Sequence, residues 1–284
     1  MSWQKGKNWR KFCVMNNKNW KRNFYVMWAG QTVSVLTSSI LQMALIWYIT
    51  QISGSALMLS LASIAGYLPS AVLGLFAGTL VDRVQRKVAV IGADLFIAAV
   101  SLALVLISLS GQIPVWIILV VLAMRSIGTA FYTPAISAAT PLIVPADQLT
   151  KCAGMTQALQ TIGNIAGIAA AGVLYPICSM STLVMFDVGG AVVASIATAL
   201  IAIPSHLDTD VPQQKKNLLH ETLEGYQILK NDRGLFALTW TAALFMIIWS
   251  PLGALFPLMS LDVFGGTTVQ ASIAEITFSV GILV

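Results

Sequence analysis

The feature that most constrains the fold of this chain is a long stretch without charge. No Asp, Glu, Lys or Arg occurs from Asn23 to Val81, a run of 59 residues. One membrane-crossing helix needs about 20 apolar residues, so the run predicts two crossings joined by a turn, which we place at the polar segment 51–55. Only 10% of all residues are charged and 57% are hydrophobic. This composition excludes a soluble enzyme, a disordered chain and a disulfide-stabilised secreted module.

The same argument, applied to the rest of the chain, predicts an all-α polytopic membrane protein. Helices are favoured over strands because the apolar segments are long and continuous, and because every backbone polar group must be satisfied inside lipid. A membrane barrel would instead show short segments of alternating polarity. The expected helices are 24–50, 56–80, 88–109, 113–133, 152–176, 182–203 and 235–260, with an eighth that begins near Ala271.

The basic residues predict how these helices are oriented. Of the 16 Lys and Arg residues, 15 lie on one side of the expected topology, and the turns around Gly54, Gly111, Cys178 and Gly265 contain none. The positive-inside rule therefore predicts a multi-pass protein of the cell membrane with a cytoplasmic N-terminal tail, residues 1–23. The basic tail is expected to face the lipid bilayer. Nucleic-acid binding is not expected, because no basic face remains once the helices are embedded.

The sequence contains no pattern that predicts catalysis or a cofactor. Its two histidines, His206 and His220, lie between the sixth and seventh expected helices and form no metal-binding pattern. No glycine-rich loop is followed by Lys and Ser or Thr, so the chain is not expected to bind ATP itself. We expect no catalytic residue, no metal and no cofactor, and an intramembrane enzyme is disfavoured. An ATP-binding partner protein remains an open alternative.

The helices suggest two transmembrane parts separated by a linker. Residues 24–203 form a six-helix half, residues 204–234 a cytoplasmic linker, and residues 235–284 the start of a second half. Within the linker, Leu219, Leu223 and Tyr226 recur at helical spacing, which predicts a short amphipathic helix. The 14 residues from Ala271 to Val284 would span only about 21 Å of a bilayer core of about 30 Å. We therefore expect the chain to be a fragment of a longer transporter.

A charged motif follows the second expected helix. Its glycine permits close helix approach, and its charges form a cluster at the membrane surface. Such a cluster can bridge two moving helix bundles in one state and release them in another. A plain stop signal that fixes topology is the alternative. Asp94, near the start of the third helix, is a candidate to join this cluster. The motif residues are Gly78, Asp82, Arg83, Arg86 and Lys87.

Several polar residues lie within the expected membrane segments. Arg125 is 11 residues from Pro114, hence about 16 Å deep, where a charge is costly unless it is paired or hydrated. Asp187 and Glu275 lie nearer the outer side and could carry a proton, or could be buried caps or ion-pair partners. Gln42 could line a substrate cavity. For Arg125 the alternative is a structural role through bonds to helix carbonyls.

The fifth expected helix carries a stripe of small residues. Gly154, Gly163, Gly167 and Gly172 recur along it. Small residues allow membrane helices to approach closely, so helix packing is the simplest function for this stripe.

These motifs resemble those of the major facilitator superfamily. Gly78, Leu80, Asp82, Arg83, Arg86 and Lys87 match its loop signature Gly-x-Leu-x-Asp-Arg-x-Gly-Arg-Lys/Arg, and Gln85 replaces the second glycine. The resemblance implies that this loop is a latch between two six-helix halves. It also implies that Arg125, followed by Gly128, takes part in proton coupling. The glycines of helix 152–176 are similar to a drug/proton antiporter motif, with Ile168 where proline is expected.

A narrower resemblance is to the macrolide-efflux branch of this superfamily. It implies export of large cationic macrolides, a small-molecule drug substrate, driven by inward movement of protons. Two alternatives stay open: a half-protein that transports nothing, and a superfamily transporter of another small molecule, nutrient importers included. The similar segments are 19–22, 28–31, 41–44, 125–131, 149–154 and 234–238.

Overall fold

Long apolar segments without breaks form helices throughout the part of the chain that the structure describes. The computed structural model describes residues 19–81, 84–108, 113–201 and 231–283, and every regular element within them is helical. The helices are α2 (Trp20–Ser53), α3 (Ala56–Val81), α4 (Arg86–Ser108), α5 (Val115–Ile143), η1 (Ala146–Gln148), α6 (Leu149–Leu174), α7 (Met180–Leu200), α9 (Arg233–Leu258), η3 (Met259–Val263) and α10 (Thr268–Leu283).

Six of the described helices, α2 to α7, are long and apolar enough to cross a membrane. Large apolar side chains such as Leu57, Leu106 and Trp116 are largely exposed on their outer faces, as expected for a surface in contact with lipid. Hydroxyl groups within the helices bond back to the preceding turn, as Thr50 and Thr140 do, which satisfies them without water. The chain is therefore a multi-pass membrane protein, as the sequence predicted.

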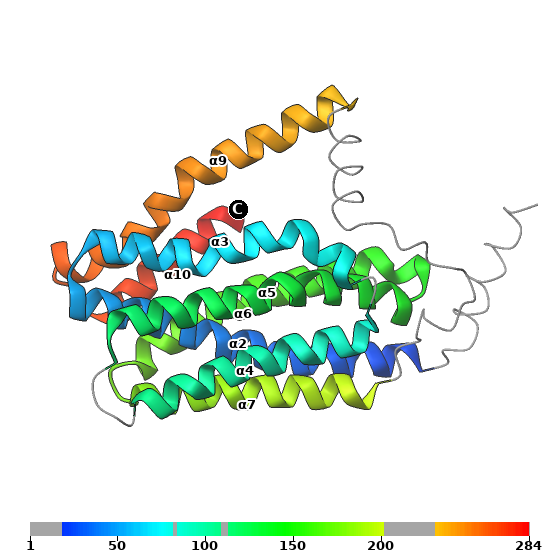
Figure 1. Cartoon of the computed structure of the whole chain (residues 1–284), viewed down its shortest axis with the longest axis horizontal. Helices are drawn as coiled ribbons and strands as arrows, with labels where there is room; N and C mark the ends of the chain where they lie inside the picture. Colours follow the sequence, from blue (N-terminus) through cyan, green and yellow to red (C-terminus); the bar gives the residue numbers. More distant parts are fainter. Residues whose placement is uncertain (1–18, 82–83, 109–112, 202–230, 284) are drawn as a thin grey trace, which may run out of the picture.

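The helix α2 lies at the centre of the six-helix bundle. It packs along α7 and α6, while α3 packs along α5, and α4 lies between α5 and α7. In Figure 1, α4 and α7 form the lower edge of the bundle and α3 the upper edge. The core is built around α2, where Leu41, Leu45, Trp47 and Ile49 are completely buried. This arrangement makes α2 the element through which the other helices are aligned.

One predicted boundary was wrong by a large margin. The sequence predicts a helix over 113–133, but α5 runs to Ile143 with Pro134 and Pro141 inside it. Proline removes one backbone hydrogen bond, and transmembrane helices tolerate this loss because neighbouring helices and local adjustments satisfy the freed groups. The other expected helices begin and end within about four residues of the observed ones.

The turn predicted at 51–55 is shorter than expected. Only Gly54 and Ser55 separate α2 from α3. Gly54 adopts a left-handed conformation with φ of 53° and its N–H bonds to the carbonyl of Thr50. Such a conformation costs little only for glycine, so this residue lets the chain reverse in two residues.

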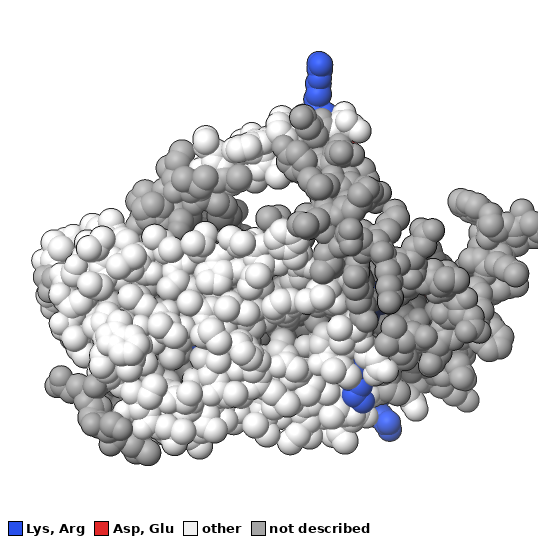
Figure 2. Space-filling model, in the orientation of Figure 1, with Lys and Arg blue, Asp and Glu red and all other residues white. Residues whose placement is uncertain are grey.

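The two ends of the bundle differ in charge. We call the end at which α2 and α4 begin and α5 ends the basic end, and the end at Gly54 and Tyr175 the neutral end. Figure 2 shows the visible Lys and Arg side chains of the described residues at the lower right of the bundle and at the top, at the start of α9, whereas the described surface toward the left is almost free of charge. Residues 202–230 are outside the described part, so most of the predicted linker, with Leu219, Leu223 and Tyr226, is outside it too.

The last two helices meet the bundle differently. α10 packs against α6, and α9 contacts α3. In Figure 1, α9 lies close to the bundle at the neutral end and leans away from α3 toward its own N-terminus. The side chain of Ser272 on α10 donates hydrogen bonds to the carbonyls of Ile168 (3.2 Å) and Thr268 (2.9 Å). A close contact between α6 and α10 is thus formed at the neutral end.

Candidate functional site

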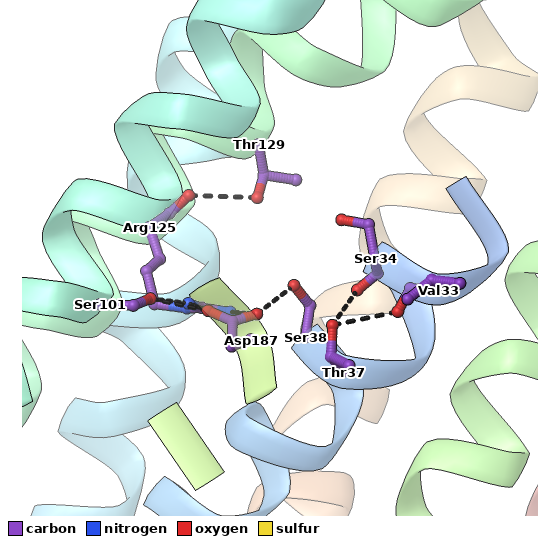
Figure 3. Close-up of polar contacts among 8 residues, drawn as sticks. All are labelled: Val33, Ser34, Thr37, Ser38, Ser101, Arg125, Thr129 and Asp187. Carbon is purple, nitrogen blue, oxygen red and sulfur yellow. Dashed lines mark hydrogen bonds and ion pairs between the residues drawn. The ribbon is translucent and has the colours of Figure 1, made fainter. Parts of the chain in front are cut away.

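An ion pair between Arg125 and Asp187 lies inside the six-helix bundle. Arg125 on α5 contacts the Asp187 carboxylate on α7: Nη1 bonds to Oδ2, and Nη2 is 3.4 Å from Oδ1 (Figure 3). The Asp187 side chain is fully buried, and the Arg125 side chain is 7% exposed. The sequence singled out both residues separately, and the fold brings them together.

Two serines complete the coordination of Asp187. Ser38 on α2 donates to Oδ1 at 2.6 Å, and Ser101 on α4 donates to Oδ2 at 2.7 Å. The Ser101 hydroxyl also accepts a hydrogen bond from Arg125. Both oxygens therefore accept from a hydroxyl and from the guanidinium, which is what a buried carboxylate requires to be tolerated. We call Ser38, Ser101, Arg125 and Asp187 the ion-pair cluster; it links α2, α4, α5 and α7.

The ion-pair cluster is deep within the membrane segment. Arg125 follows Pro114 by 11 residues along α5, which is about 16 Å and close to the middle of a bilayer core of about 30 Å. One turn further, Gly128 lets α5 approach α4: a Cβ there would be 2.5 Å from Ile97 Cγ1. Gly128 thus serves close packing beside Arg125. The serines were missed, because Ser is common in membrane helices and only the fold shows which ones face a charge.

The charged motif after α3 is partly described. Asp82 and Arg83 are outside the described residues. Arg86 donates to the Ala138 carbonyl of α5 at 3.0 Å. Lys87 Nζ donates to the carbonyls of Ala199 (2.7 Å) and Ile201 (2.9 Å) at the end of α7. These two basic side chains therefore bind helix carbonyls at the basic end.

Gly78 lies near the end of α3, and Asp94 lies inside α4. No described atom of another segment lies within 4 Å of a Cβ built on Gly78, so its predicted role in close helix approach stays a prediction. Asp94 is 3% exposed and lies beside Gln31 of α2. The prediction that it joins the basic motif was wrong, because Asp94 is two turns inside α4 and points into the bundle.

Substitution of Lys87 tests the contribution of its hydrogen bonds to the carbonyls at the end of α7. We expect Lys87→Met to lower the free energy of unfolding by about 1 kcal/mol, since a cation at a helix C-terminus stabilises the exposed carbonyls by about this amount. Lys151→Met is the matched control, because Lys151 is exposed near the same end. Thermal unfolding of both variants in detergent measures the difference. Equal stability of the two variants would contradict the contact.

Gln42 and Glu275 lie apart from the ion-pair cluster. Gln42 is one turn beyond Ser38 on α2, and its Nε2 would be 3.7 Å from a Cβ on Gly66 of α3. Glu275 is partly buried on α10, one turn beyond Ser272. Neither side chain is among the hydrogen-bond partners of Asp187, so the four predicted polar positions form one pair and two separate sites.

A pocket of about 470 Å³ opens at the neutral end between the bundle and the η3–α10 segment. Gln42 does not line it. Burial raises the pKa of Tyr175 to about 12, so its hydroxyl stays protonated, and it donates to Gln51 Oε1 at 2.9 Å. The lining residues include Tyr48, Gln51, Tyr175, Met180, Leu261 and Thr268.

Three of the four glycines on α6 bring it against other helices. A Cβ on Gly163 would be 2.8 Å from Val35 of α2, one on Gly167 would be 3.0 Å from the Leu36 carbonyl, and one on Gly172 would collide with Ser272 of α10. Gly154 is exposed, and nothing described lies within 4 Å of its Cβ position. Gly154 therefore does not belong to the packing stripe.

Comparison with known proteins decides the family. The sequence pattern of the transmembrane secretion effector family, a branch of the major facilitator superfamily, matches residues 20–283. The chain belongs to this family. It is 49% identical over 266 residues to macrolide efflux protein A of Streptococcus pyogenes, covering 94% of this chain and 65% of that protein. It is 47% identical over 231 residues to macrolide efflux protein A of Enterococcus faecalis, covering 81% of this chain and 71% of that protein.

A solved structure has the same fold. It is a bacterial homologue of the human lysosomal transporter Spinster, in an inward-facing and unoccupied conformation, with a TM-score of 0.65 and 16% identity. The match covers 93% of this chain and 60% of that one. This chain spans about 65% of the length of the Streptococcus pyogenes relative. The predicted superfamily and all-α fold are confirmed.

Proposed function

We propose that this protein takes part in exporting a hydrophobic drug of the macrolide class across the cell membrane, in exchange for protons. The observation that carries the proposal is the 49% identity, over 94% of the chain, to a macrolide efflux protein. A buried ion pair near mid-depth is consistent with it, because ionisable residues in membrane segments commonly mark transport pathways or proton relays. Protons are the coupling ion of this proposal, and neither a cofactor nor ATP is needed.

The proposed orientation follows from charge. Lys21, Arg86, Lys87 and Lys151 all belong to the basic end, and the positive-inside rule places such residues in the cytoplasm. We therefore propose that the basic end, with the N-terminus, is cytoplasmic. Substrate would then leave through the neutral end. Single cysteines introduced at Ser55 and Lys151, in a variant whose native cysteines Cys13, Cys152 and Cys178 are replaced by serine, test this with a membrane-impermeant reagent. Only the cysteine at position 55 should react in intact cells.

Within this proposal, the ion-pair cluster holds α2, α4, α5 and α7 in register. Breaking the contact between Arg125 and Asp187 would leave an isolated charge inside the membrane, so the pair is expected to persist unless a proton or a substrate compensates it. The proposed latch residues Asp82 and Arg83, together with Arg86, would control opening at the basic end. Glu275 and Gln42 are proposed cavity residues, and the pocket at the neutral end is the proposed exit region.

Accumulation of a labelled macrolide tests the proposed function. Susceptible bacteria that express the complete gene should accumulate less erythromycin than cells with an empty vector, and a protonophore should abolish the difference. The Asp82→Asn variant should behave like the empty vector if the latch is required, and Asp147→Asn, at an exposed position of η1, is the matched control. Equal accumulation in all strains, or lowered accumulation of a sugar only, would overturn the macrolide proposal.

A further inference from the structure

A second buried polar cluster lies between the basic end and the ion-pair cluster. Asp94 of α4 lies beside Gln31 of α2, and the hydroxyl of Tyr132 of α5 donates a hydrogen bond to Gln31 Oε1. Asp94 is 3% exposed and Gln31 is 5% exposed. Three helices thus bring together a carboxyl, an amide and a phenol at a depth where water is scarce.

Two atoms of this cluster are left without a regular hydrogen bond. Asp94 Oδ2 and Gln31 Nε2 are buried and lack a hydrogen bond of regular geometry, although the Gln31 amide is close enough to Asp94 to interact with it. Buried polar atoms are nearly always bonded, and an unpaired carboxylate oxygen is the more costly case. Asp94 differs in this respect from Asp187, whose two carboxylate oxygens each accept hydrogen bonds from two donors.

No cation compensates a negative charge at Asp94 among the described residues around it. The ionisable groups that face it are Tyr132 of α5 and Asp187 of α7. Asp187 carries the same charge and is already paired with Arg125. A carboxylate in this position is repelled by Asp187 and is favoured by the neighbouring Gln31 amide only, whereas a neutral carboxyl avoids most of the desolvation cost.

A narrow pocket reaches the cluster from the side of α6. It has a volume of about 10 Å³, which is room for about one water molecule. Gln31 and Tyr132 line it together with Phe24, Trp28, Thr156 and Gln160. Phe24 and Trp28 lie in the first turns of α2, so the pocket is on the side of the cluster that faces the basic end.

We propose that Asp94 is the proton-binding site of this transporter. The carboxyl group holds a proton in the conformation described above. When the helices around it separate enough to admit water, the O–H bond breaks, the proton passes to a water molecule, and Asp94 is left as a carboxylate. Gln31 and Tyr132 are positioning residues: the Gln31 amide is available to bond the carboxylate, and Tyr132 fixes the orientation of that amide. This inference rests on the proposed proton coupling and names the residue that carries the proton.

Infrared spectroscopy of the purified full-length protein tests proton binding without transport. The wild-type spectrum at neutral pH should contain a protonated carboxyl band that shifts in heavy water. Asp94→Asn should lose this band, and Asp147→Asn, the exposed control, should retain it. A band that persists unchanged in Asp94→Asn would overturn the proposal.

Transport in proteoliposomes tests the coupling. Asp94→Asn should lower accumulation of erythromycin driven by a proton gradient about tenfold or more, while exchange of drug for drug without a gradient continues. Asp94→Glu, which keeps a carboxyl group, should restore part of the gradient-driven transport. Gradient-driven transport at the wild-type level in Asp94→Asn would refute the proposed role of Asp94 and would leave the proposed drug export unaffected. If the wild type moves no drug in either assay, the proposed function fails, and the infrared band still decides whether Asp94 binds a proton.

Discussion

Arg125→Leu is expected to destabilise the protein by about 3–5 kcal/mol. The substitution leaves the Asp187 carboxylate, which is fully buried, without its guanidinium partner in the middle of the membrane segment. The remaining donors are the hydroxyls of Ser38 and Ser101, which cannot neutralise the charge. Thermal and chemical unfolding in detergent should show a strongly lowered midpoint, together with a reduced yield of folded protein.

The double variant Arg125→Leu/Asp187→Leu separates the cost of an unpaired charge from the loss of the pair itself. Replacing both members of a buried ion pair with apolar residues is often nearly neutral for stability. The double variant should therefore recover most of the stability lost in Arg125→Leu. If the double variant is as unstable as the single one, the two side chains do not interact energetically. A stable double variant that fails to export drug would assign the pair a role in transport.

Alanine at two glycines of α6 is expected to change stability in opposite directions. A Cβ on Gly167 would collide with the Ser39 side chain and would be 3.0 Å from the Leu36 carbonyl and 3.3 Å from the Ile40 nitrogen. Because two of these atoms are backbone, the helices must separate, and we expect a loss of about 1–3 kcal/mol. At Gly154 nothing is displaced, so the better helix propensity of alanine should stabilise the protein by up to about 1 kcal/mol.

The two alanine variants are compared by thermal unfolding in the same detergent. Each variant adds one methyl group to the same helix, at a different position, so detergent effects cancel. A midpoint for Gly167→Ala equal to or above that of Gly154→Ala would mean that α2 and α6 do not approach as closely as described. Gly163→Ala is an intermediate case, because its nearest neighbour is the end of the Val35 side chain, at 2.8 Å.

The fold was largely predictable because the bilayer imposes strong requirements. A charge-free run of 59 residues has few solutions in lipid, and helix ends follow from charges and turn residues. The misplaced end of α5 shows the limit of this argument: Pro134 stops a helix in water more effectively than in a bundle where neighbours satisfy the freed groups. The sequence indicates that Arg125 and Asp187 are each unfavourable inside the membrane, but it does not indicate that they form an ion pair with each other.

The second polar cluster was beyond prediction for a related reason. Gln31, Asp94 and Tyr132 are far apart in the chain, and nothing in their spacing indicates that three helices bring them together. Asp94 was assigned to the basic motif because it is near that motif in sequence. Which polar residues meet inside a bundle depends on the rotation of each helix about its axis, and that rotation is set by packing against every neighbour.

The ion-pair cluster also has a mechanical consequence. It ties α2, α4, α5 and α7 together with hydrogen bonds that cannot be replaced by water at that depth, so these four helices resist sliding past one another. A protein built in this way changes shape by moving rigid blocks rather than by deforming one of them. The contact between α6 and α10 depends instead on small residues and hydroxyl–carbonyl bonds, which break and re-form at little cost. Because the ion-pair cluster makes α2, α4, α5 and α7 the most rigid part of the molecule, motion is expected at the weaker contacts between helices, such as that between α6 and α10.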